Sequence, residues 1–264
     1  MSRGRLIMDL VRGGRTISYG ADRSQRGDLH VPPGPGPHPV IVLIHGGSWQ
    51  ARYGRLVMRP LAGDLLRRGW ASWNVEYRRV GNGGGWPHTF ADVAAAIDHL
   101  PDVDASLDLA RVSLLGHSAG GHLALWAAGR ENLPPGAPGV REDGPSVRPR
   151  GVIAQAGVCD LAGAYRRWRG GPARALMGGG PDEVAARYDA GDPLRLLPLP
   201  MPALLVHGTE DRTVSIELSR SYARAALAAG SEVELVEIAG AAGGHRSHID
   251  PRTSAWAEVA SRLG

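Results

Sequence analysis

Continuous apolar runs rich in valine, isoleucine and leucine recur along this chain, and amphipathic stretches separate them. Runs without polar alternation are typical of strands that are covered on both faces. We expect strands at residues 40–44, 70–77, 112–115, 152–156, 203–206 and 233–238. We expect helices at about 56–68, 90–100, 120–130, 215–229 and 252–263. Because strand and helix alternate, the chain is predicted to form an α/β fold, with a mostly parallel sheet and helices on both faces.

Other stretches differ from this pattern. Residues 16–19 and 28–31 are predicted to form short antiparallel edge strands. A chain of 264 residues still fits one hydrophobic core, so we predict a single domain over residues 1–264. Residues 133–150 are rich in proline and glycine, and residues 163–200 are rich in arginine, glycine and alanine. We expect both to be lid or cap insertions over one end of the sheet, where substrate walls usually lie.

Charge and composition exclude several classes of function. All thirty basic residues are arginine, against 26 acidic residues, and the formal net charge is +4. Because arginine is spread over every segment, we expect no nucleic-acid partner. No apolar run approaches the roughly 18 residues of a membrane-spanning helix, and the one near the N-terminus stops at Asp9. We therefore expect no membrane partner and a cytoplasmic location. The single cysteine, Cys159, excludes an intramolecular disulfide.

The strongest motif lies where a predicted buried strand meets a predicted helix. There the chain reads Gly-His-Ser-Ala-Gly, with the serine at position 118. A nucleophile at such a sharp turn has a strained backbone and needs small residues two positions before and two positions after it. Gly116 and Gly120 occupy these positions. The turn exposes the Ser118 hydroxyl at a helix N-terminus, where backbone N–H groups favour a developing oxyanion. We predict that Ser118 is a catalytic nucleophile.

A second glycine-containing segment, His45 to Trp49, directly follows the strand predicted at residues 40–44. Consecutive glycines let the backbone turn its N–H groups into a cleft. Together with the N–H of Ala119, these groups are expected to hold the oxygen of a tetrahedral intermediate. We expect His45 to brace this loop by hydrogen bonding rather than to act as a base, and Trp49 to line the substrate pocket, with His117 of the serine motif as a further pocket residue.

A catalytic histidine needs a carboxylate that orients it. We expect this carboxylate beyond the carboxyl ends of the strands, where sites gather in parallel sheets. Asp211 follows the strand predicted at residues 203–206 and suits this role. Its neighbour Glu210 is one alternative. Asp160, which follows the strand predicted at residues 152–156, is another.

Two histidines, His245 and His248, follow the last predicted strand, and either is a candidate base. Gly243 and Gly244 would let the ring of His245 swing into the cleft, which favours His245. The other histidines are not spaced like a zinc site, and no metal or organic cofactor is implied.

The candidate residues appear in the order Ser118, Asp211, His245, and this order resembles that of the α/β-hydrolase fold. The segments His-Gly-Gly-x-Trp and Gly-His-Ser-Ala-Gly-Gly-His resemble those of the branch that contains small carboxylesterases, acetyl-xylan and feruloyl esterase-like domains, and kynurenine formamidases. In that branch a Gly-His is often followed four residues later by Ile-Asp-Pro, as His245 is here, and the resemblance therefore favours His245 over His248. It also implies Gly47, Ser48 and Ala119 as the oxyanion donors.

Two residues depart from the pattern of this branch. Arg246 stands where an aromatic or apolar residue usually follows the catalytic histidine, and Ser48 stands where formamidases often carry an aromatic residue. The sequence thus predicts a serine hydrolase that cleaves short-chain acyl or acetyl esters. Its expected partner is a small-molecule ester or amide substrate. The alternatives are an arylformamidase that cleaves N-formylkynurenine and a non-catalytic protein that uses the cleft as a ligand pocket. Neither a monomer nor a homodimer is favoured.

Overall fold

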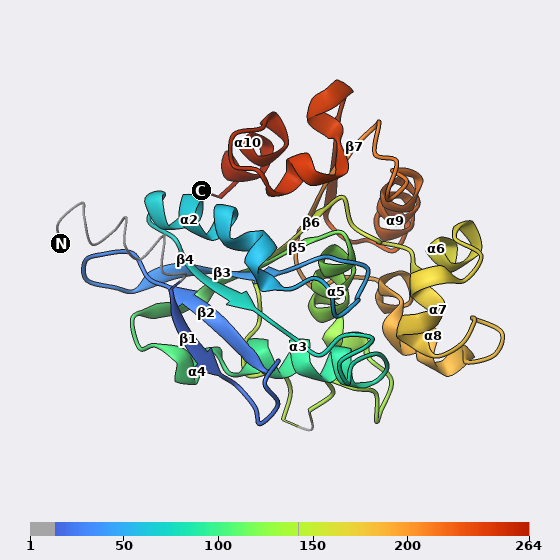
Figure 1. Ribbon diagram of the computed structural model, residues 1–264, viewed down its shortest axis with the longest axis horizontal. Helices are drawn as coiled ribbons and strands as arrows, with labels where there is room; N and C mark the ends of the chain where they lie inside the picture. Colours follow the sequence, from blue (N-terminus) through green and yellow to red (C-terminus); the bar gives the residue numbers. More distant parts are fainter. Residues whose placement is uncertain (1–13, 142, 264) are drawn as a thin grey trace.

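The central feature of the molecule is a twisted eight-stranded sheet in the order β1-β2-β4-β3-β5-β6-β7-β8 (Figure 1). The computed structural model describes residues 14–141 and 143–263, so the first nine residues, on which the location was predicted, lie outside it. The strands are β1 (Arg15–Ser18), β2 (Arg26–His30), β3 (His38–Ile44), β4 (Ala71–Val75), β5 (Leu107–His117), β6 (Gly151–Gln155), β7 (Ala203–Gly208) and β8 (Val233–Ile238). Strand β2 runs antiparallel to β1 and β4, and all other neighbours are parallel.

Helices cover both faces of the sheet (Figure 1). The α-helices are α2 (Arg59–Arg67), α3 (His88–Asp98), α4 (Leu100–Val103), α5 (Ala119–Ala128), α6 (Leu161–Arg167), α7 (Gly171–Met177), α8 (Ala185–Gly191), α9 (Glu217–Ala228) and α10 (Ser254–Ala260). Short 3-10 helices are η1 (Arg55–Met58), η2 (Arg130–Asn132), η3 (Pro193–Leu196), η4 (Gly240–Gly243) and η5 (His245–Ile249). Helices α2 and α10 pack on one face, and α3, α5 and α9 pack on the other. This is the predicted α/β-hydrolase fold.

Alternate side chains of the inner strands divide the core into two layers. In β3, Val42 and Ile44 pack with α3 and α5, whereas Ile41 and Leu43 pack with α2 and α10. All four side chains are fully buried, which accounts for the unbroken apolar run in the sequence.

The structure corrects two of the predicted elements. Strand β5 begins at Leu107 rather than at residue 112, because Leu107 pairs with His38 before the register shifts to the pair of Val40 and Val112. The segment of residues 163–200, in which no helix was predicted, contains α7, α8, η3 and most of α6. Each of these helices spans seven residues or fewer, too short for a repeating apolar pattern to stand out.

The two predicted insertions lie at different ends of the sheet. Residues 133–150 lead into the amino end of β6 and follow the C-terminal end of α5, where Arg130 binds Asp98 through two contacts of 2.7 and 3.1 Å. Residues 163–200 follow the carboxyl end of β6, and the Trp126 indole of α5 donates to the Ala190 carbonyl at 2.9 Å. Only the second segment therefore borders the carboxyl ends of the strands, and a lid role for either remains a prediction.

Within the described residues, no helix is long and apolar enough to cross a membrane. The cytoplasmic location expected from the sequence remains a prediction.

A buried hydrogen bond joins the two helices on the α2 face of the sheet. The indole of Trp256, which is fully buried, donates to the Asp64 carboxylate at 2.7 Å, and Arg67 and Arg68 bind the same carboxylate. We expect Trp256→Phe to lower the free energy of unfolding by roughly 2–4 kcal/mol, because it leaves a cavity and removes one donor from Asp64. Urea unfolding measures this loss.

Trp70→Phe is the matched control, since Trp70 is only half-buried and packs at the edge of the same layer. It is expected to cost less than about 1 kcal/mol. A loss below about 1 kcal/mol in Trp256→Phe as well would show that the Trp256 hydrogen bond and its burial contribute little.

Candidate active site

Ser118 lies in the sharp turn between β5 and α5, with φ 56° and ψ −120°. Its left-handed φ is rare for a residue with a side chain. The turn is possible because Gly116 and Gly120 lie against each other, and a β-carbon on Gly120 would collide with the carbonyl of Ile44 in β3. The backbone N–H of Ser118 donates to the Gln155 carbonyl at 2.9 Å, which ties the turn to β6.

Two further candidate residues meet Ser118 at the carboxyl ends of the strands. The Ser118 Oγ lies 3.0 Å from Nε2 of His245, and Nδ1 of His245 lies 2.7 Å from Oδ2 of Asp211. An ionised carboxylate only accepts, so the His245 Nδ1–H donates to it, and Nε2 is left to accept the serine hydroxyl. The loops after β5, β7 and β8 supply the three residues, and the structure brings together the set predicted from their order in the chain.

The Asp211 carboxylate is fully buried and well supplied with donors. Its Oδ1 accepts the backbone N–H groups of Thr213 at 2.8 Å and Val214 at 3.0 Å. Burial alone would raise the pKa of Asp211, but hydrogen bonds from His207 and His245 outweigh it and hold the pKa well below its usual range. Asp211 is therefore charged at neutral pH and fixes the orientation of the His245 ring.

The alternative residues lie elsewhere. Glu210 is exposed, and Asp160 accepts the Gly163 N–H at 2.6 Å as the N-cap of α6. His248 is fully buried, and neither of its ring nitrogens has a hydrogen-bond partner within the described residues. Burial lowers the pKa of His248 to about 4. Of the candidate acids and bases, Asp211 and His245 are thus the pair joined to Ser118.

The loop after β3 has an unusual backbone. Gly47, Ser48 and Trp49 all have positive φ, at 117°, 54° and 55°. A β-carbon on Gly46 would meet the carbonyl of His117 and the β-carbon of Ser118, so the loop approaches the serine closely. Within residues 14–141 and 143–263, the N–H groups of Gly47 and Ser48 donate no hydrogen bond. They are free donors beside the candidate nucleophile, as an oxyanion site requires.

His45 braces this loop, as the sequence predicts. Its Nδ1 lies 2.7 Å from the Gly46 carbonyl and its Nε2 lies 2.8 Å from the Glu76 carboxylate, while its ring stacks on Tyr77 at 4.3 Å. Burial raises the pKa of Glu76, but the hydrogen bond from His45 and the charge of Arg79 outweigh it, and the pKa lies below its usual value. A buried polar network therefore fixes the loop from beneath.

His117 supports the second loop of the site. Its Nε2–H donates to the His245 carbonyl at 2.9 Å, and the two rings lie 4.7 Å apart. Burial, together with the neighbouring His245, lowers the pKa of His117 to about 3, so its ring is neutral at pH 7. His117 thus connects the serine turn to the histidine loop, and it also borders the cleft as expected.

The cleft consists of two hollows that meet at Ser118 and share Ser48 and Thr213. The first, which we call the His245 hollow, has a volume of about 280 Å³ and is also lined by Gly47, Tyr53, Val57, His117, His245, Arg246 and Ile249. The second, the Trp168 hollow, has a volume of about 350 Å³ and is also lined by Trp49, Ala119, Val158, Trp168, Pro172 and Val214. Trp49 is therefore a wall of the second hollow.

Sequence reasoning missed several residues of the site. Glu76 was placed inside the strand predicted at residues 70–77, and a lone carboxylate near the end of an otherwise apolar strand was the available signal. In the structure it directly follows β4, which is parallel to β3. Trp168 and Pro172 come from the segment in which no helix was expected. No pattern in the sequence marks Tyr53 or Thr213 as neighbours of Ser118.

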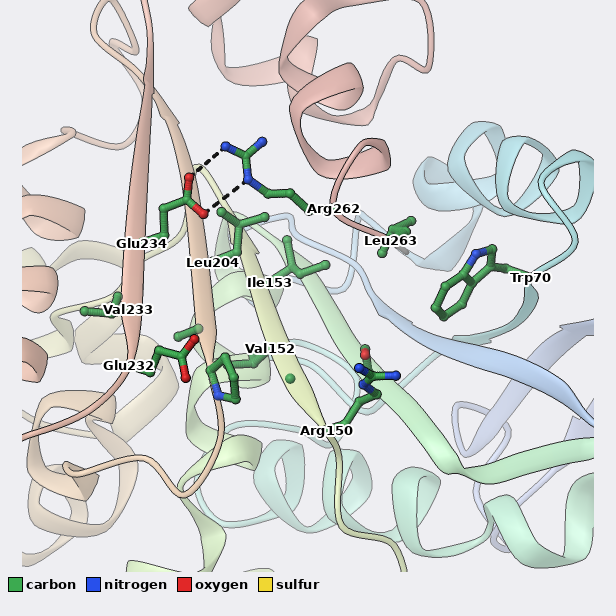
Figure 2. A pocket seen from close by; sticks show the side chains of 14 residues that line it. Trp70, Arg150, Val152, Ile153, Leu204, Glu232, Val233, Glu234, Arg262 and Leu263 are labelled. Carbon is green, nitrogen blue, oxygen red and sulfur yellow. Dashed lines mark hydrogen bonds and ion pairs between the residues drawn. The ribbon is translucent and has the colours of Figure 1, made fainter.

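A larger hollow of about 600 Å³ opens at the opposite ends of the parallel strands (Figure 2). Trp70, Ile153 and Leu204 line it, beside the ion pair of Glu234 and Arg262 at 2.7 Å (Figure 2). Among the described residues, its lining contains no histidine or cysteine, and one of its two glutamates, Glu234, is held by Arg262. In the described part of the chain, no group of three or more histidine, cysteine, aspartate or glutamate residues is placed to hold a metal ion.

Comparisons with known proteins agree with this architecture. The BD-FAE family model matches residues 28–225. Esterase LipC of Mycobacterium tuberculosis (strain ATCC 25618 / H37Rv) is 28% identical over 253 aligned residues, and the match covers 87% of this chain. The chain spans only 59% of the length of LipC.

Solved structures of esterases share the fold. A truncated carbohydrate esterase from gut microbiota superimposes with a TM-score of 0.79 at 21% identity, covering 94% of this chain and 93% of that one. The propionate-bound esterase Est2 of the Planctomycetes species Thermogutta terrifontis gives a TM-score of 0.69 at 26% identity, covering 88% of this chain and 85% of that one.

Two buried histidines outside the hollows of the cleft, His122 and His248, predict acid sensitivity. Burial lowers the pKa of both His122 and His248 to about 4. The unfolded chain takes up protons on these rings below about pH 6.5, whereas the folded chain does so only near pH 4, so stability falls as the pH drops through this window. We expect each ring to account for about 2–3 kcal/mol of the loss between pH 7 and pH 4.5.

His248→Leu removes one of these rings, and its loss of unfolding free energy between pH 7 and pH 4.5 is expected to be smaller than that of the wild type. Urea unfolding at the two pH values measures the difference. His88→Gln, at an exposed ring, is the matched control. An unchanged loss in His248→Leu contradicts the assignment of a neutral buried ring.

Proposed function

The chain belongs to the BD-FAE family, and we propose that it is a serine hydrolase that cleaves carboxylic esters of short acyl chains. Ser118 is the nucleophile, and His245 is the general base and then the general acid. Asp211 orients the His245 ring and stabilises its positively charged form. The backbone N–H groups of Gly47, Ser48 and Ala119 form the oxyanion hole.

The proposal rests on the arrangement of Ser118, His245 and Asp211. The Ser118 hydroxyl, on a strained turn at the N-terminus of α5, lies 3.0 Å from a ring nitrogen of His245 whose other nitrogen is 2.7 Å from the buried Asp211 carboxylate. A strained backbone at a cleft is commonly functional. Acyl transfer requires a nucleophile, a base and a carboxylate that orients the base, and these three groups lie in one line here.

In the proposed mechanism, the Ser118 Oγ attacks the ester carbonyl carbon while its proton passes to Nε2 of His245. The carbonyl oxygen becomes an oxyanion and is held by the free N–H groups of the loop after β3 and by the N–H of Ala119. Each such donor lowers the barrier by roughly 3–4 kcal/mol. As the tetrahedral intermediate collapses, His245 returns the proton to the alcohol oxygen, the carbon–oxygen bond breaks and the alcohol leaves.

Water then enters and His245 removes its proton, so that a hydroxide equivalent attacks the acyl carbon. The second tetrahedral intermediate releases the carboxylic acid and restores the Ser118 hydroxyl. The buried Asp211 charge stabilises the imidazolium form of His245 in both halves of the reaction. The limited volume of each hollow, about 280 and 350 Å³, favours small substrates. The propionate in the Est2 structure is likewise a short acyl group.

Hydrolysis of p-nitrophenyl acetate and butyrate tests the proposal. We expect the wild type to hydrolyse both esters, and Ser118→Ala and His245→Ala each to lower kcat at least about a thousandfold, because either change removes the activated nucleophile. Asp211→Asn is expected to lower kcat by a similar factor through the wrong imidazole tautomer.

His248→Leu is the control that separates the two histidines, and it is expected to keep most of the activity. Full activity in His245→Ala would contradict the assigned base. A folded wild type that hydrolyses neither ester would contradict the ester hydrolase proposal, and N-formylkynurenine would then be the next substrate to measure.

A further inference from the structure

The two hollows of the cleft have different roles if Ser118 and His245 act as proposed. A general acid must reach the oxygen of the leaving alcohol, so the alcohol portion of the ester lies on the side of His245. His245 lines the His245 hollow and not the Trp168 hollow. The alcohol portion is therefore assigned to the His245 hollow. The acyl portion is assigned to the Trp168 hollow, whose apolar wall includes Val158, Trp168 and Val214.

The two hollows also differ in charge. Arg246 lines the His245 hollow and is exposed, and no aspartate or glutamate lines that hollow within the described residues. The Trp168 hollow is lined by no charged side chain from the part of the chain that the structure describes. The alcohol side of the cleft therefore carries a positive charge that the acyl side lacks.

The charge of Arg246 is available to a ligand. In residues 14–141 and 143–263 its guanidinium has no hydrogen bond or ion pair, whereas the nearby Arg252 binds Asp250 at 2.7 and 2.9 Å. Asp250 lines the groove next to Arg246, but both of its carboxylate oxygens are taken by Arg252. Asp211, the other carboxylate near the site, is held by His245 and by backbone N–H groups. Neither acid forms an ion pair with Arg246 in the described part of the chain.

A guanidinium presents a planar fork of donors that matches a carboxylate. We propose that Arg246 selects esters whose alcohol portion carries a carboxylate, which it binds at the mouth of the His245 hollow. This inference rests on the proposed esterase activity and adds the chemical class of the leaving group. Because Arg246 is exposed, the gain is modest and falls with salt, as for other solvent-exposed ion pairs.

A pair of probes isolates the charge of the leaving group. 4-Acetoxybenzoate releases a phenol that carries a carboxylate, and its methyl ester releases the same phenol with that charge masked. The measured quantity is the ratio of kcat/KM for the charged probe to kcat/KM for the neutral probe. Comparing this ratio between variants cancels the intrinsic reactivity of the two esters.

We expect Arg246→Gln to lower this ratio about fivefold, mainly by raising KM for the charged probe. Arg246→Lys keeps the charge but loses the fork, and is expected to lie between the wild type and Arg246→Gln. Raising the ionic strength is expected to reduce the wild-type ratio towards that of Arg246→Gln. Arg212→Gln is the matched control, since Arg212 is also exposed, stands beside Asp211 and lines neither hollow.

A second pair of probes tests the side of the cleft. Monophenyl succinate carries its carboxylate on the acyl portion, and phenyl butyrate is its neutral counterpart. Arg246→Gln is expected to leave the ratio for this pair unchanged.

Three results would overturn the inference. An unchanged charged-to-neutral ratio in Arg246→Gln, with the methyl ester still hydrolysed, rejects the role of Arg246 and leaves the esterase proposal intact. An equal fall in Arg212→Gln assigns the effect to the overall charge of the protein. If the folded wild type hydrolyses none of the four probes, the proposed function itself fails, and the inference fails with it.

Discussion

The sharp turn at Ser118 is the constraint on which the site depends. Its left-handed backbone lifts the serine hydroxyl above the ends of the strands, and it persists because the surrounding packing leaves the chain no alternative. Gly116 and Gly120 allow β5, α5 and the end of β3 to approach more closely than any side chain would permit. The same close contact brings the loop after β3 beside Ser118. The position of the candidate nucleophile and that of the candidate oxyanion donors thus have one common cause.

Buried polar groups then fix each loop that reaches the cleft. His45 and Glu76 hold the loop after β3, His207 and backbone N–H groups hold Asp211, and His117 holds the backbone of His245. Each network lies at the carboxyl end of a parallel strand, where burial strengthens hydrogen bonds and makes an unpaired group costly. Loops that are otherwise irregular are therefore held firmly, as a site for positioned chemistry needs.

The sequence allowed the fold and the three central residues of the site to be predicted, because those features depend on local patterns. The apolar runs, the glycines around Ser118 and the chain order of Ser118, Asp211 and His245 are all readable along the chain. The missed features depend on contacts between distant segments. Trp168 reaches the cleft from a short helix with no clear periodicity, and Tyr53 reaches it because Gly47 leaves room for its ring. Among residues 14–141 and 143–263, Arg246 likewise has no ion-pair partner while Asp250 binds Arg252, and no motif encodes this choice of partner.

The proposed mechanism depends on a covalent acyl intermediate at Ser118. Wild-type protein mixed with p-nitrophenyl acetate, quenched with acid within the first turnovers and digested, tests it directly by tandem mass spectrometry. We expect the added mass of one acetyl group on Ser118, and its absence from the same peptide of Ser118→Ala. Turnover of the ester with no acetyl group on the protein, or with the acetyl group on another residue, would contradict it.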